Sequence, residues 1–203
     1  MPTPTEVIPT GGFDPLFFWE QHKKQIVIYA VVLGVGALAF GIYQVNSFRR
    51  AAQAQELFAH ASTAGDYRQI IQEYPLSVEA GNAHLLLAAQ LRSEKDYEGS
   101  IATLRDFIAQ QPDHPLVDGG FLSLAADYEA EGKTGQALDE YQKIISRFSD
   151  RYSAPVAQMA RANLLRSQGN LDEARRAYEN VQAQFPESYF SQQALQEAKL
   201  LKK

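Results

Sequence analysis

The segment ALDEYQKI, residues 137–144, decides the fold. It places the small residue Ala137 four positions before the aromatic Tyr141, and the apolar Ile144 follows three positions later. This spacing puts all three side chains on one face of a helix. The same pattern recurs 37 residues earlier and 37 residues later, which indicates a structural repeat. The recurring columns are Ser100, Ala137 and Ala174, then Leu104, Tyr141 and Tyr178, then Phe107, Ile144 and Val181.

Three further columns keep the same period: Ala88, Ala125 and Ala162, then Leu91, Tyr128 and Leu165, then Pro112, Ser149 and Pro186. Each unit reads as two helices, because a connection such as Gly132-Lys133-Thr134 contains a residue that tolerates the left-handed backbone at a helix end. The first helices are expected at residues 80–93, 119–131 and 154–168. One helical hairpin cannot bury this face alone, so neighbouring hairpins must stack. The predicted fold is an all-α solenoid with about three full repeats plus capping helices.

This pattern resembles the tetratricopeptide repeat, whose second helix carries a small residue, an aromatic residue four positions later and a terminal proline. The resemblance implies a partner-binding groove lined by the first helices. The positions carried over are Asn82, Leu85, Ala89, Arg92, Leu122, Ala126, Glu129, Met159, Asn163 and Arg166. The middle of this set is apolar and its edge is charged, which favours an extended or helical apolar segment as the ligand. The alternative is that some of these residues only pack between repeats.

A stretch without charge, from Gln25 to Phe48, precedes the repeats. Residues 26–45 would span about 30 Å as a helix, the thickness of a bilayer core. Eleven of these residues are Leu, Ile, Val or Phe, which contribute about −3 to −7 kcal/mol to insertion. The flanking residues suited to the headgroup region are Trp19, Lys23, Lys24, Arg49 and Arg50. We therefore predict one transmembrane helix in a lipid bilayer; the alternative is a signal peptide cleaved at Ala52-Gln53-Ala54.

Inside this span, Ala30, Gly34, Ala37 and Gly41 share one helical face, where another helix could approach closely. Asp14 and Pro15 are expected to start the helix. The predicted division of the chain is a disordered leader at 1–13, an interfacial segment and transmembrane helix at 14–46, connecting helices or a partial repeat at 47–78, and the repeat domain with a C-terminal capping helix at 79–203. Within the connecting part, the membrane helix is expected to continue outward, and residues 66–74 are expected to form a truncated half-repeat.

Composition and motifs argue against catalysis. The chain has no cysteine, its four histidines lack metal-ligand spacing, and no nucleophile or phosphate-loop motif is present. A net charge of −5 without a basic stripe argues against a nucleic-acid partner. Asp127, Glu129 and Glu131 are expected on a solvated helix face. We therefore expect no enzyme activity, no catalytic, cofactor-binding or metal-binding residues, and no small-molecule substrate.

The anchor and the array together resemble the bacterial ancillary subunit of the Sec translocon, through FFWE at 17–20, VLGVGAL at 32–38 and the Ala/Gln-rich helix that follows. This resemblance implies a scaffold in the bacterial inner membrane, with a cytoplasmic N-terminus and a periplasmic repeat domain that contacts the translocon and periplasmic chaperones. The basic residues on the two sides of the span are equal in number and do not choose the orientation.

Another stretch of the chain leaves the assignment open. Tyr74-Pro75-Leu76-Ser77 is similar to junctions in periplasmic repeat proteins of outer-membrane assembly and cell-division coordination. The alternatives are therefore a periplasmic adaptor for envelope assembly or cell division with a cleaved signal sequence, or an accessory subunit of another membrane complex.

Overall fold

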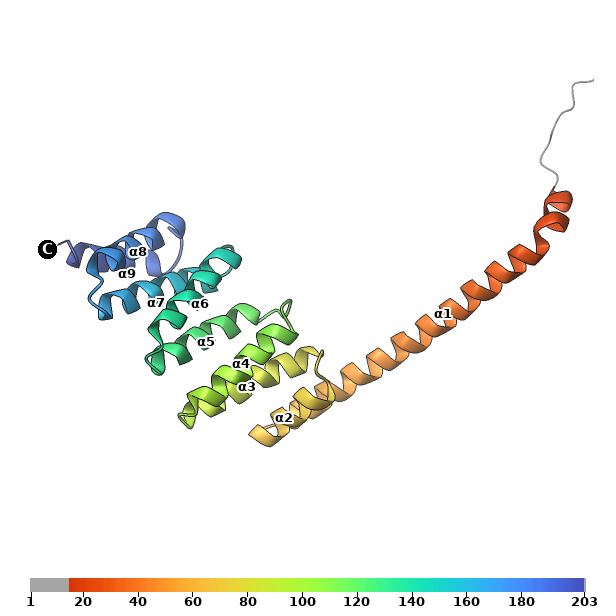
Figure 1. The fold of residues 1–203 in the computed structure, drawn as a ribbon, viewed down its shortest axis with the longest axis horizontal. Helices are drawn as coiled ribbons and strands as arrows, with labels where there is room; N and C mark the ends of the chain where they lie inside the picture. Colours follow the sequence, from red (N-terminus) through yellow and green to blue (C-terminus); the bar gives the residue numbers. More distant parts are fainter. Residues whose placement is uncertain (1–14, 203) are drawn as a thin grey trace, which may run out of the picture. The chain divides into compact units, whose positions relative to one another are not determined.

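A computed structural model describes residues 15–202, and within this range every regular element is an α-helix. The predicted all-α class is therefore confirmed. Helix α1 (Pro15–His60) has 46 residues. The helices that follow are α2 (Ala64–Glu73), α3 (Val78–Ser93), α4 (Tyr97–Gln110), α5 (Val117–Ala130), α6 (Thr134–Arg147), α7 (Ser153–Ser167), α8 (Leu171–Gln184) and α9 (Phe190–Leu200), as Figure 1 shows. The predicted leader at 1–13 and the Asp14 cap lie outside the described residues.

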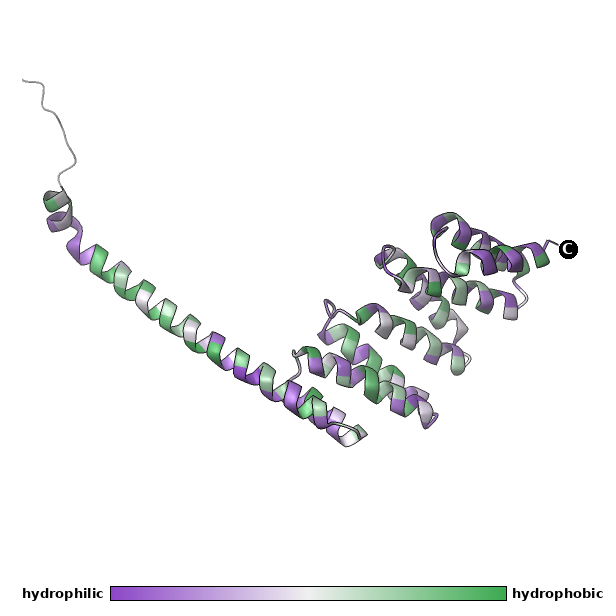
Figure 2. Ribbon diagram, turned by 180° about the vertical axis from the view of Figure 1, so that it is seen from behind, coloured by the Kyte–Doolittle hydropathy of each residue, from purple (hydrophilic) through white to green (hydrophobic). Residues whose placement is uncertain are grey.

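The chain divides into two compact units, with the boundary between Arg50 and Ala51. In the first unit, the apolar side chains of α1 are exposed from Val27, at 52%, to Phe48, at 76%. Figure 2 shows this long run of apolar residues in α1. Its length and composition are sufficient to cross a membrane, although a signal sequence near an N-terminus shares both properties.

The second unit is a row of helical hairpins. Each helix from α2 to α8 packs against the next one in the chain, and α7 also contacts both α5 and α9. The hairpins α3–α4, α5–α6 and α7–α8 are the three predicted repeats, and α9 packs on the last of them. Figure 1 shows these hairpins following one another in chain order. The predicted solenoid is therefore confirmed.

Five of the six columns found in the sequence form the core of this solenoid, whereas the column of Pro112, Ser149 and Pro186 is exposed. Ser100, Ala137 and Ala174 are completely buried where the two helices of each hairpin cross. Among the larger side chains, Phe107 and Tyr178 are also completely buried. Each such side chain contributes about 1.5–3 kcal/mol of hydrophobic stabilisation. The repeat period of the sequence is thus the period of the buried core.

The array begins earlier than the sequence prediction placed it. Ala54, in the last part of α1, and Ile70, in α2, are completely buried. They precede Leu91 and Phe107 by one period, 37 residues. Leu57 and Phe58 of α1 pack on the same small core, which also includes Ala80 and Ala83 of α3. The half-repeat expected at residues 66–74 therefore has a first helix after all, and the end of α1 supplies it.

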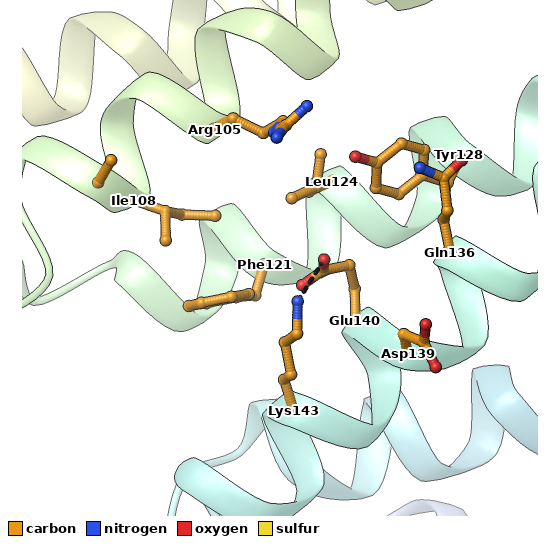
Figure 3. A pocket seen from close by; sticks show the side chains of 10 residues that line it. Arg105, Ile108, Phe121, Leu124, Tyr128, Gln136, Asp139, Glu140 and Lys143 are labelled. Atoms are coloured by element: carbon orange, nitrogen blue, oxygen red, sulfur yellow. Dashed lines mark hydrogen bonds and ion pairs between the residues drawn. The ribbon is translucent and has the colours of Figure 1, made fainter.

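Stacking of the repeats leaves a pocket between the second helices α4 and α6, above α5 (Figure 3). Its volume is about 420 Å³. We call it the α4–α6 pocket. Apolar walls come from Ile108 of α4 and from Phe121 and Leu124 of α5, while Glu140 and Lys143 of α6 supply polar groups.

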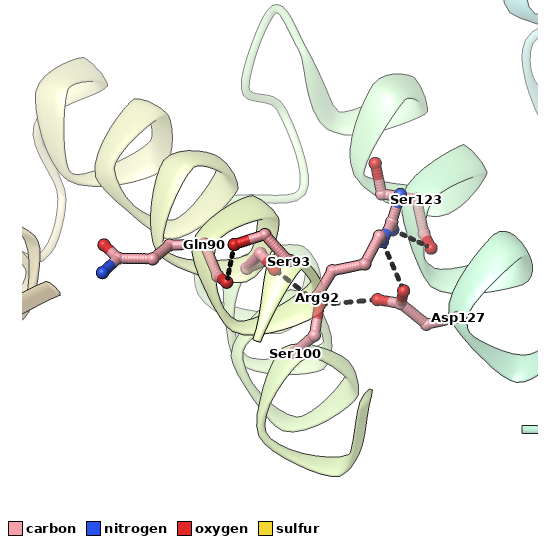
Figure 4. A network of polar contacts seen from close by, with 7 residues as sticks. Gln90, Arg92, Ser93, Ser100, Ser123 and Asp127 are labelled. Atoms are coloured by element: carbon pink, nitrogen blue, oxygen red, sulfur yellow. Dashed lines mark hydrogen bonds and ion pairs between the residues drawn. The ribbon is translucent and has the colours of Figure 1, made fainter. Parts of the chain in front are cut away.

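An ion pair between the half-buried Arg92 and the fully buried Asp127 joins the first two full repeats (Figure 4). Arg92 Nε of α3 lies 2.5 Å from Asp127 Oδ1 of α5, and Arg92 Nη2 donates to the Ser123 carbonyl at 2.7 Å. The Ser100 hydroxyl donates to Asp127 Oδ2 at 2.6 Å. The Asp127 side chain is completely buried, so the expectation of a solvated position for it was wrong. Arg92, from the preceding repeat, compensates the buried charge.

Two histidines flank a core phenylalanine within the first full repeat. The rings of His84 and Phe107 are 5.9 Å apart, and those of Phe107 and His114 are 5.1 Å apart. His114 Nδ1 accepts the Leu116 N–H at 3.1 Å, and His114 Nε2 lies 3.2 Å from the Val78 carbonyl oxygen. Burial lowers the pKa of His84, against the opposing effects of the Ala80 carbonyl and Asp106. Both rings therefore contribute to the packing around Phe107.

We expect Arg92→Met to lower the free energy of unfolding by about 2–3 kcal/mol, because it leaves the buried Asp127 carboxylate without its cation. Denaturant unfolding of the full-length protein in detergent, followed by circular dichroism, measures the change. The matched control is Arg151→Met. It removes the exposed pair between Arg151 and Asp118, which also joins α5 to the segment before α7, and should cost less than about 1 kcal/mol. Equal losses in the two variants would contradict the assigned role of the buried pair.

Acid should destabilise the repeats through His84. Its folded pKa lies below the ordinary value of 6.5, so the unfolded chain binds the proton more readily and the free energy of unfolding falls as pH decreases through 6.5. His84→Gln, which copies the residue found two periods later at Gln158, should flatten this dependence between about pH 7.5 and 5. The exposed His60→Gln is the control and should keep the wild-type slope. Identical slopes for all three proteins would rule out His84 as the cause.

Candidate partner-binding surface

The first helices α3, α5 and α7 carry the residues predicted to line a binding groove, and the structure gives them unequal exposure. We call the solvent-facing sides of these three helices the first-helix surface. The predicted residues that are exposed are Ala89, Glu129, Asn163 and Arg166. Those that are half-buried are Asn82, Leu85, Arg92, Leu122 and Ala126. Met159 is buried.

The apolar middle of the predicted groove contributes to the core. Leu85 and Leu122 pack against the main buried cluster, and Met159 belongs to a second cluster with α8 and α9. These three side chains therefore link neighbouring helices, as the alternative interpretation of the sequence anticipated. Only the exposed parts of the Leu85 and Leu122 side chains are accessible to a ligand.

The charged edge of the predicted groove is paired within the protein. Arg92 is engaged by Asp127, and Arg166 forms an ion pair with Glu197 of α9. Glu129 accepts a hydrogen bond from the Tyr141 hydroxyl at 3.2 Å. Burial, followed by the charge of Glu129, raises the pKa of Tyr141, so this hydroxyl remains a donor. Arg92 therefore joins α3 to α5 and Arg166 joins α7 to α9, whereas Glu129 bonds within its own hairpin and remains exposed.

What remains at the first-helix surface is mostly small and apolar. Leu86 in the middle of α3 is 43% exposed, and Ala89 is exposed one turn further on. Gly119 and Ala126 of α5 are half-exposed, and a Cβ built on Gly119 meets no atom within 4 Å. Small side chains let the backbone of a partner approach closely, and Leu86 offers one larger contact. Sequence reasoning missed Leu86 because its column continues as Ser123 and Ala160, which carry no apolar signal.

A second exposed row lies at the junctions between repeats, and it too was missed. Val78, Pro115, Tyr152 and Tyr189 follow one another at 37-residue intervals, and all are exposed. Tyr152 is 71% exposed and Tyr189 is 83% exposed. The same period that revealed the core could have revealed this row, because exposed positions repeat as regularly as buried ones.

The predicted membrane residues lie on α1 in the first unit. Trp19, Lys23, Lys24, Arg49 and Arg50 are all exposed. Ala30, Gly34, Ala37 and Gly41 are exposed as well, and a Cβ built on Gly34 or Gly41 meets nothing within 4 Å. This face therefore has room for another helix. Among the described residues, no group of three or more His, Asp or Glu side chains is arranged to hold a metal ion.

Comparison with known proteins places this architecture in a family. The sequence profile described as the tetratricopeptide repeat-like domain matches residues 17–201. No curated protein matches the sequence. Among solved structures, a crystal structure of nearly identical TPR-like repeats from a kinesin light chain-like protein of Podosopora anserina shares 17% identity, with a TM-score of 0.55 over 78% of this chain and 82% of that one. Another structure of these repeats shares 14% identity, with a TM-score of 0.46 over 76% and 93%.

At 17% identity the first of these structures supports the fold alone, whereas the profile match covers most of the sequence, from the apolar helix to the last helix. This chain belongs to the tetratricopeptide repeat-like domain family.

Proposed function

We propose that this protein is a membrane-anchored scaffold, in which α1 crosses the bilayer once and the first-helix surface binds a protein partner. The proposal rests on one observation, that two different surfaces occur on the same chain. One is a band of exposed apolar side chains on α1, and the other is a shallow, small-residue surface on stacked repeats. Repeat solenoids use extended surfaces of the second kind to bind proteins. A membrane accounts for the apolar band on α1, because in water these apolar side chains would remain exposed to the solvent, which is unfavourable.

The position of the first repeat supports a retained anchor over a cleaved signal peptide. The candidate cleavage site, Ala52-Gln53-Ala54, lies inside α1, and Ala54 is completely buried within the N-terminal half-repeat. A peptidase needs an extended, accessible segment, so cleavage there would first require this core to open. The family profile also begins at residue 17, so it includes the apolar helix.

The resemblance of residues 17–20 and 32–38 to the ancillary subunit of the Sec translocon supports a specific setting. In this proposal the protein lies in the bacterial inner membrane, with its N-terminus in the cytoplasm and its repeats in the periplasm. The repeats contact the translocon and periplasmic chaperones. The small side chains of the first-helix surface, with Arg92 and Arg166 already paired within the protein, favour an apolar segment as the ligand, either extended or helical.

The exposed face formed by Ala30, Gly34, Ala37 and Gly41 favours a second candidate function. A membrane helix of another complex could pack against it, since small residues allow close contact between helices in lipid. In that case the protein is an accessory subunit of a membrane complex, and α1 is itself a binding site.

The anchor predicts how the protein partitions between membrane and solution. After extraction of cell membranes with alkaline carbonate, the full-length protein should stay in the pellet, because its apolar band remains in the bilayer. A variant that begins at Ala51 serves as the control and should appear in the supernatant. Release of the full-length chain, or a mature chain shorter than 22.6 kDa that begins within α1, would contradict the anchor.

The first-helix surface predicts where a partner touches the array. A photocrosslinking amino acid placed at Ala89 or Ala126 should capture the same protein in native membranes, identified by mass spectrometry. Ala102 is the matched control, an exposed alanine on the second helix α4 of the same repeat as Ala89. Adducts that contain a translocon subunit would support the specific setting. Equal capture from Ala102 would contradict a first-helix surface, and adducts with soluble proteins alone would contradict the translocon.

A further inference from the structure

Exposed apolar side chains of the repeat domain gather at the linkers between hairpins. These linkers are residues 74–77, 111–116, 148–152 and 185–189. Between Ala51 and Lys202, eight large apolar side chains are exposed, and five of them lie in a linker or directly after one. Apolar residues scattered singly need no explanation, whereas their concentration at one kind of position indicates an interaction surface. We call these five residues the junction ridge: Leu76, Val78, Leu116, Tyr152 and Tyr189.

Contacts between successive linkers make the ridge continuous. Gln111 Nε2 donates to the Pro75 carbonyl at 2.9 Å, which joins the first linker to the second. Arg151 Nη1 donates to the Pro115 carbonyl at 3.0 Å, which joins the second linker to the third. The centroid of the Tyr152 ring lies 6.3 Å from that of the first residue of α9, which follows the fourth linker. The linkers are therefore fixed side by side, and a partner does not have to order them on binding.

The linker charges that are left unpaired are negative. Asp113, Asp150 and Glu187 occupy the same position in three successive linkers, one period apart, and all three are exposed. None of them forms an ion pair within the described part of the chain. Arg151 is the one Lys or Arg residue of the linkers, and it lies 2.9 Å from the Asp118 carboxylate. The ridge therefore attracts positive charge.

Two exposed tyrosines add to this attraction. Tyr152 and Tyr189 each follow an acidic residue by two positions, and they are 71% and 83% exposed. The face of an aromatic ring carries negative potential and attracts the cation of a Lys or Arg side chain. The protein makes this contact with its own residues next to the third linker, where the Arg147 guanidinium lies 5.2 Å from the centroid of the Phe121 ring. Ring faces and carboxylates together therefore select a basic side chain.

We propose that the junction ridge binds a segment of a protein partner in which basic residues stand beside apolar ones. The basic side chains lie against Tyr152 and Tyr189, and the apolar side chains lie against the leucines and the valine of the ridge. An anionic membrane surface is the less suitable occupant, because the three linker carboxylates repel it. The ridge lies at the ends of the hairpins and the first-helix surface lies on the sides of α3, α5 and α7, so the proposal goes beyond the proposed function and does not depend on it.

The test measures binding of a peptide to the full-length protein in phosphatidylcholine nanodiscs. The probe is fluorescein-labelled Gly-Lys-Leu-Ser-Lys-Leu-Ser-Lys-Leu-amide, and two partner probes replace every lysine by glutamate or every leucine by serine. Fluorescence anisotropy should show saturable binding of the first peptide beyond that to empty nanodiscs. Each partner probe should bind at least about tenfold more weakly, because it lacks either the cations or the apolar groups. No saturable binding, or equal binding of a partner probe, would overturn the proposal.

Variants of the ridge locate the site. The double variant Tyr152→Ser, Tyr189→Ser should weaken binding of the lysine–leucine peptide by about tenfold, because two cation–π contacts are lost. The double variant Asp150→Asn, Glu187→Gln keeps the rings and should weaken binding by about threefold, as expected for exposed charges. Unchanged affinity in either variant, at the wild-type melting temperature, would overturn the site.

Matched controls lie at the other end of the hairpins, where α8 begins. Leu171 is 50% exposed, and Asp172 and Glu173 are exposed carboxylates beside it. Leu171→Ser and the double variant Asp172→Asn, Glu173→Gln should each change the affinity by less than about twofold. Losses equal to those of the ridge variants would show general attraction to the surface and overturn the site.

Flotation tests a lipid occupant directly. Nanodiscs that carry the protein should not float with vesicles of phosphatidylcholine and phosphatidylglycerol, because the ridge is negatively charged. Flotation that disappears in the Tyr152→Ser, Tyr189→Ser variant would show that the ridge binds lipid, and it would overturn the proposal of a protein segment.

Discussion

Close approach of the two helices within each hairpin is the constraint on which the array depends. Ser100, Ala137 and Ala174 occupy the crossing points and are completely buried, so a larger side chain at any of them would push the helices apart. The aromatic residues four positions later, Tyr141 and Tyr178, are buried, and their hydroxyls donate to Glu129 and Asn163 on the first helix of the same hairpin. A hairpin built in this way covers one of its faces only by stacking on another hairpin. The solenoid arrangement therefore depends on small side chains at these three positions.

The crossing point of the first full repeat also shows why these units are not interchangeable. Ser100 stands where the other units have alanine, and its hydroxyl donates to the buried Asp127 carboxylate as well as approaching the Ala88 carbonyl at 3.0 Å. Arg92 completes the charge balance from the preceding helix. An alanine at position 100 would keep the packing but leave one carboxylate oxygen without its donor. Small size and hydrogen bonding are therefore required at the same position, and serine meets both requirements.

Sequence reasoning reached the fold because the core repeats at a constant interval, and a column of buried residues is visible in one sequence. It missed the Arg92–Asp127 pair because the two residues are 35 positions apart and occupy different columns, so no comparison between units brings them together. It placed Leu85 and Leu122 in the ligand-binding groove because the sequence pattern of a half-buried leucine is the same as that of an exposed one. Sequence reasoning also gave no sign that Glu140 of α6 is only 8% exposed, since a glutamate on the polar side of a second helix carries no signal of burial. Periodicity predicts which residues share an environment, whereas contacts between units decide what that environment is.

The end of α1 is the clearest case in which both the sequence pattern and the contacts between units are needed to interpret a segment. Up to Arg50 the helix exposes apolar side chains on all sides, which suits lipid, whereas after Ala51 only residues such as Ala54, Leu57 and Phe58 turn toward a protein core. The change occurs within one helix, and no loop separates the apolar band from the first half-repeat. Ile70 of α2 is completely buried in a small core with Ala80 and Ala83 of α3, and Leu57 and Phe58 of α1 pack against this core. Loss of the helix at Ala54 would therefore remove a wall of the array, and the segment that ends the apolar helix is also an element of the repeat fold.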